Sequence, residues 1–182
     1  MSRIKSAWEI ALERAGAMEV PPEELQKQRE EKCRLAGAAI ADKFLGIFDL
    51  KQLQDDLEKQ PGEDKGLVAK AVVRRLVSAL ELGDYEKMEK IMAGIALVGD
   101  NQKSNETKAK LYLLYDSYRD VLRKKEQEID AAGRKILGRL GISGEAVQMI
   151  NADINKEWAK ALQAASRPYE KEFALYKEEL LQ

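Results

Sequence analysis

Residues 104–140 read SNETKAKLYLLYDSYRDVLRKKEQEIDAAGRKILGRL. Apolar side chains recur along this stretch at alternating steps of four and three residues, at Leu111, Tyr115, Tyr118, Leu122, Ile129, Ala132 and Ile136, and Lys125 fills the one missing position. This period keeps a narrow apolar seam on one side of an α-helix. The stretch contains no proline, and its only glycines lie near its end. It therefore predicts one long helix, capped by Ser104 or Asn105, whose seam must pack against a partner.

The nearest partner is the following segment, residues 143–181. Its apolar side chains make a returning seam at Ile150, Ile154, Trp158, Leu162, Ala165, Tyr169, Phe173 and Tyr176. Gly141 closes the long helix and Ser143 is a favourable cap for the next one. We therefore expect residues 104–182 to form a long antiparallel, coiled-coil-like helical hairpin. Pro168 lies inside the second arm and should kink it, or split it near Ser166.

Residues 1–100 carry the same helical periodicity in shorter segments. The sequence predicts helices over residues 2–15, from Pro22 to about 49, and over 50–59, 64–82 and 85–98, separated by glycine and proline turns. The first of them has an apolar stripe of Ile4, Trp8 and Leu12. The helix over 64–82 has the widest apolar face and should be the most buried. The predicted fold class is therefore all-α, a single domain over 1–182 with a short-helix bundle at 1–100 and a long helical hairpin at 104–182.

The run KSAWEIALER, from Lys5 to Arg14, resembles the opening of small, uncharacterised, all-helical bacterial proteins. The resemblance implies a bacterial source. The resemblance implies no activity.

Composition excludes several kinds of chemistry. The chain has 182 residues, a net charge of −1 and no histidine, so it lacks the usual general base and the commonest transition-metal ligand. Its one cysteine, Cys33, lies on an apolar stripe and is expected to be an inert core thiol, as in a reducing cytoplasm. No run is long and apolar enough to predict a transmembrane segment. We therefore expect no catalytic residue, no cofactor and no metal site, and a cytoplasmic location.

The predicted function is that of a non-enzymatic structural or interaction protein that acts through helix packing. A helix of 36 residues is about 54 Å long, whereas a compact domain of this size is about 40 Å across. The excess favours a homodimer, or a helical protein partner. The candidate interface residues are Ile4, Trp8, Leu12, Leu111, Tyr115, Tyr118, Leu122, Lys125, Ile129, Ile136, Ile150, Ile154 and Trp158.

Two alternatives remain open at this point. The first is a small-molecule-binding or enzymatic bundle that uses carboxylate, tyrosine or lysine groups. The second is a weak electrostatic binder of nucleic acid or membrane through the basic part of residues 119–139. Acidic residues alternate with the basic ones there, so local salt pairing is the simpler interpretation. Tyr115 and Tyr118 lie on the seam, which favours core packing over base stacking.

Overall fold

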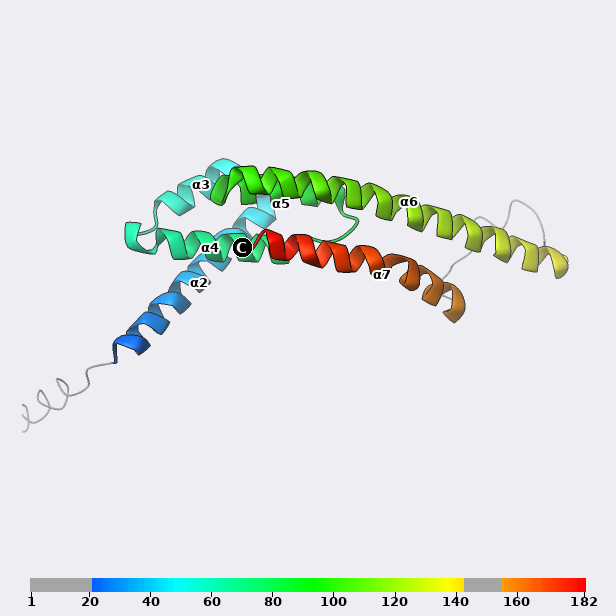
Figure 1. Cartoon of the computed structure of the whole chain (residues 1–182), viewed down its shortest axis with the longest axis horizontal. Coiled ribbons are helices and arrows are strands. Elements are labelled where there is room, and N and C mark those ends of the chain that lie inside the picture. The colour runs from blue at the N-terminus through cyan, green and yellow to red at the C-terminus, as the bar shows by residue number, and fades with distance from the viewer. Residues whose placement is uncertain (1–20, 143–154) are drawn as a thin grey trace, which may run out of the picture.

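The computed structural model describes residues 21–142 and 155–182. Helices make up nearly all of this part of the chain, and it contains no strand, which confirms the all-α prediction. The helices are α2 (Pro22–Ile47), α3 (Leu50–Glu58), α4 (Gly62–Ser78), α5 (Tyr85–Val98), α6 (Asn101–Arg139) and α7 (Lys156–Glu179). Figure 1 shows an elongated molecule, with α2 to α5 gathered at one end and α6 and α7 running lengthwise away from them.

The bundle end is built on a close crossing of α2 and α4. Gly37 allows the approach, because a Cβ atom at this position would lie 2.5 Å from the Ala71 Cβ and 2.7 Å from the Val68 carbonyl oxygen. α2 then ends at Phe48, whose N–H still donates to the Phe44 carbonyl and whose left-handed backbone turns the chain out of the helix. The next residue, Asp49, caps α3. Gly37 of α2 thus positions α4. The turn at Phe48 and Asp49 directs the chain into α3 and back over α4.

One core joins the bundle to the hairpin. α4 contributes buried side chains from the wide apolar face predicted for residues 64–82, and Leu80 continues this face just beyond the end of the helix. α5 contributes a similar set of buried side chains. The core members from these two segments are Val68, Val72, Leu76, Val77, Leu80, Met88, Ile91, Met92 and Ile95. Leu111, Leu114 and Tyr115 of α6 and Phe173 and Leu180 of α7 belong to the same cluster. The two halves of the chain are therefore packed on each other.

The start of α6 differs from the prediction. Asp100 is the N-cap and accepts a hydrogen bond from the backbone N–H of Lys103, so the helix begins at Asn101. Ser104 is buried within the first turns, and the prediction that Ser104 or Asn105 caps the helix is wrong. An aspartate at the cap satisfies an amide and places a negative charge at the positive end of the helix dipole, and both effects favour this start.

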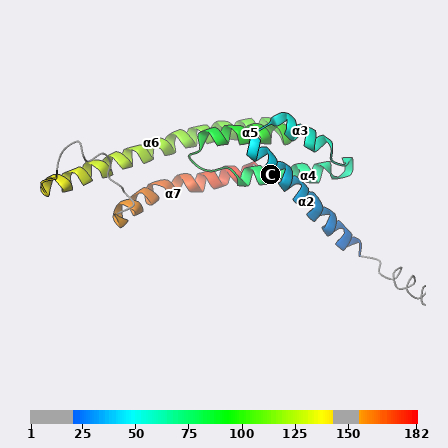
Figure 2. The ribbon, with the colours of Figure 1, turned by 180° about the vertical axis from the view of Figure 1, so that it is seen from behind.

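α6 and α7 run antiparallel, side by side. Three pairs fix the register: Lys110 with Glu179, Tyr115 with Phe173, and Tyr118 with Tyr169. α7 curves but stays continuous through Pro168 (Figures 1 and 2), so the predicted split near Ser166 is wrong. Pro168 removes one backbone donor. Beyond the proline, α7 continues to pack on α6 through Tyr169 and Phe173.

α7 is also joined to the end of α4 by a lysine. Lys177 Nζ donates to the carbonyl oxygens of Ser78, at 3.3 Å, and Leu80, at 3.0 Å. These carbonyls follow the last turn of α4, where no intrahelical donor remains. The ammonium also lies 5.3 Å from the centre of the Phe173 ring. Burial lowers the pKa of Lys177.

Candidate functional site

The predicted interface residues lie in different surroundings along α6 and α7. Leu111, Tyr115 and Ile129 are buried; Tyr118, Leu122, Lys125 and Trp158 are half-buried; and Ile136 is exposed. Ile4, Trp8, Leu12, Ile150 and Ile154 lie outside the described residues. Leu114 and Thr107 are buried as well, although the seam period does not include them. They are buried because this end of α6 packs on α5 as well as α7, which requires a wider apolar face than a two-helix seam.

Aromatic rings connect α5, α6 and α7. The ring centres of Tyr85 and Tyr112 are 5.0 Å apart, and Tyr115 lies 6.0 Å from both Tyr85 and Phe173. The Tyr115 hydroxyl donates to the backbone carbonyl of Glu81, and burial raises the pKa of this tyrosine. The rings pack edge to face or tilted on one another. This arrangement favours a structural role over stacking on bases.

Tyr112 gives a prediction about alkaline pH. Its hydroxyl donates to Glu89, and burial together with this carboxylate raises the pKa of Tyr112 to about 12. The native state therefore favours the neutral phenol. The contribution of Tyr112 to the free energy of unfolding is full below the pKa of an unfolded tyrosine, about 10, and is lost as the pH rises towards 12. A near-ultraviolet absorbance titration should show a late tyrosinate phase whose amplitude falls in Tyr112→Phe. In Glu89→Gln the same phase should move to lower pH; an unmoved phase would contradict the role of Glu89.

Four of the seven basic residues of 119–139 are paired locally. Four ion pairs join side chains three or four residues apart on α6: Asp116–Arg119 at 2.9 Å, Asp120–Arg123 at 3.3 Å, Lys125–Glu128 at 2.7 Å and Asp130–Arg134 at 2.6 Å. All are largely exposed, so each contributes little to stability. The electrostatic alternative gains no support from this part of α6.

A group of exposed apolar side chains lies at the far end of α6. Ile136, Leu140 and Ile142 are 49%, 69% and 50% exposed, and we call them the distal apolar patch. Gly141, with φ of +76°, ends the helix in a Schellman motif: the Ile142 N–H donates to Leu137 and the Gly141 N–H to Gly138. The patch thus lies on an ordered helix end.

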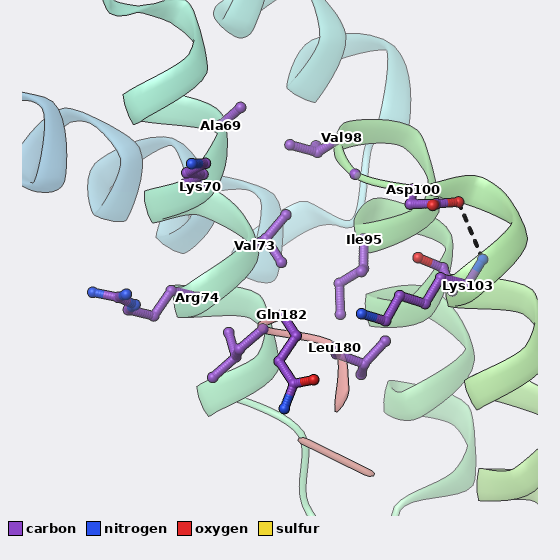
Figure 3. Close-up of a pocket in the computed structure, with 13 residues that line it drawn as sticks. Ala69, Lys70, Val73, Arg74, Ile95, Val98, Asp100, Lys103, Leu180 and Gln182 are labelled. Atoms are coloured by element: carbon purple, nitrogen blue, oxygen red, sulfur yellow. Dashed lines mark hydrogen bonds between the residues drawn. The ribbon is translucent and has the colours of Figure 1, made fainter. Parts of the chain in front are cut away.

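An open hollow lies at the other end of the molecule, between α4, the α5–α6 turn and the residues after α7. Its volume is about 520 Å³. Figure 3 shows Lys103 reaching towards Leu180 and Gln182, with Lys70 on the opposite side. Arg74 stands at the rim and, like Lys70, also lines a second hollow between α2 and α4. We call the first of these the basic hollow.

The described residues give little support to a metal site, a reactive thiol or a membrane-spanning helix. No cluster of three or more Cys, Asp or Glu side chains in 21–142 and 155–182 has a geometry that could hold a metal ion. Cys33 is buried, and burial raises the pKa of its thiol, which disfavours the reactive thiolate. Within the same ranges, every helix is too short or too polar to cross a lipid bilayer.

The fold thus defines a class, an elongated all-α protein in which a short-helix bundle is continued by two long paired helices. No protein-family model matches the chain, and the comparisons with curated proteins and with solved structures found no match. Function has to be inferred from the side chains themselves.

Proposed function

We propose that this chain is a non-enzymatic interaction protein that acts through helix packing and associates with a second copy of itself at the distal apolar patch. The observation that carries the proposal is that α6 continues past the start of α7 and ends in exposed apolar side chains (Figure 1). Soluble surfaces scatter single apolar residues, but grouped ones mark contact sites. A two-fold axis at the patch would place the patch of one copy against the same patch of the other, so that apolar side chains meet apolar side chains.

The expected association is weak. Full burial of one leucine or isoleucine side chain contributes about 1.5–3 kcal/mol, and three such residues make a patch smaller than that of a standard interface. Lys135 and Arg139 flank the patch, so two copies bring like charges together. Salt screens that repulsion. Association should therefore strengthen as salt is added, whereas binding to nucleic acid would weaken.

Light scattering after gel filtration tests the proposal. The wild-type mass should rise with concentration, and more so at high salt, while Ile136→Glu/Leu140→Glu should stay monomeric. The matched control is Leu113→Glu, because Leu113 is 72% exposed on the same helix but lies near the bundle. It should behave as wild type. A wild-type monomer at every concentration, or equal loss of association in the control, would overturn the proposal.

A cytoplasmic location belongs to the same proposal. Cys33 is buried and forms no disulfide, and it is the only cysteine of the chain. A lone reduced thiol is typical of proteins from reducing compartments. Cell fractionation with a thiol-specific label on the denatured protein would test whether the cysteine stays reduced.

A further inference from the structure

Positive charge in the basic hollow lacks partners. None of Lys70, Arg74 and Lys103 forms an ion pair within the described residues, whereas the next arginine of α4, Arg75, pairs with Asp42 at 2.7 Å. The single acidic residue of the lining, Asp100, is occupied as the cap of α6. The side chains of the lining comprise three cations and one carboxylate, and the main-chain carboxyl group of Gln182, also in the lining, offsets one more positive charge, which leaves a local surplus of about one. This surplus contrasts with the near-neutral chain as a whole.

The inside of the basic hollow is apolar. Val73 and Val98 are half-buried in its lining, whereas Ile95 and Leu180, which belong to the core cluster, are only 1% and 9% exposed. In Figure 3 Val73 and Ile95 lie between Lys70 and Lys103. The hollow therefore combines an apolar floor with a cationic rim. A volume of about 520 Å³ is within the range of small-molecule sites.

We propose that the basic hollow binds a small organic phosphate monoester with an apolar body. A phosphate monoester carries a charge of about −1.5 to −2 at neutral pH, opposite in sign to the local surplus. Lys103 binds the phosphate oxygens through charge-assisted hydrogen bonds, and Lys70 and Arg74 add attraction from the rim. The apolar body covers Val73 and Val98. This site lies at the opposite end of the molecule from the distal apolar patch and does not depend on it.

Isothermal titration calorimetry with octyl phosphate, below its micelle concentration, tests the proposal. Octyl phosphate should bind the full chain at least about tenfold more tightly than inorganic phosphate, which lacks the apolar body, or octanol, which lacks the charge. Octanoate, with a single negative charge, should fall between them. The double variant Lys70→Gln/Lys103→Gln should lose about tenfold in affinity for octyl phosphate.

The matched control is Lys156→Gln/Lys160→Gln. It removes the same charge from two exposed lysines at the start of α7, far from the hollow, and should bind as wild type. Circular dichroism of both double variants checks that the fold is kept. Absence of octyl phosphate binding, equal binding of octanol, or an equal loss in the control would overturn the proposal. The distal apolar patch is intact in all these proteins, so a loss of octyl phosphate binding cannot be attributed to a change in self-association.

Discussion

Replacing Leu111 with alanine should lower the free energy of unfolding by about 2–5 kcal/mol. Leu111 is fully buried, with 0% of its surface exposed, in the core cluster that α6 shares with α4, α5 and α7. The truncated side chain leaves a cavity among side chains from several helices, and these can close it only in part. Urea denaturation followed by circular dichroism measures the loss as a lower midpoint at an unchanged slope.

The same substitution two residues further along the helix is its control. Leu113 is 72% exposed, so Leu113→Ala should change the free energy of unfolding by no more than about 0.5 kcal/mol. Both variants lose the same atoms and gain the same helix propensity. If the two had equal effects, α6 would not be anchored through Leu111, and the shared core of bundle and hairpin would be wrong.

Local signals in the sequence were sufficient to predict most helices of the bundle. Tyr85–Val98 is a helix, as predicted, and Asp84 is its cap; a turn glycine and a capping aspartate act within a few residues of each other. The apolar row through Val68 and Val72 is buried as the period of the sequence implied. Such features depend on neighbours within one or two turns, so one sequence is enough to predict them.

Features that depend on tertiary contacts were missed. The contact of Lys177 with the end of α4 joins residues almost a hundred positions apart, and nothing near either segment indicates it. α7 stays continuous through Pro168 and packs against α6 on the far side of the proline, at Tyr169 and Phe173. Lys70 and Lys103 come from different helices, α4 and α6, and only the packing of both helices on α5 brings the two lysines to the basic hollow. A surplus of unpaired lysine in one place is invisible in a chain whose total charge is close to zero.

Replacing Gly37 with leucine should lower the free energy of unfolding by about 3 kcal/mol or more. The added Cβ would overlap both the Ala71 Cβ and the Val68 carbonyl oxygen, at 2.5 and 2.7 Å, and the backbone of α4 cannot move aside without opening the core. Helix propensity acts in the opposite direction, since leucine is favoured over glycine by about 0.5–1 kcal/mol. Overpacking outweighs this gain because the contact is with backbone. Thermal and urea unfolding measure the net effect.

The matched control is Gly66→Leu, on the partner helix α4. A Cβ at Gly66 meets nothing within 4 Å, so only the propensity gain remains and the variant should be slightly more stable than wild type. Adding Ala71→Gly to Gly37→Leu should restore part of the stability, because it removes the closest of the two overlaps and leaves the one with Val68. If Gly37→Leu stabilised the protein as Gly66→Leu does, α2 and α4 would not be in backbone contact. The position of α4, and with it the lysine and arginine that line the basic hollow, would then need another explanation.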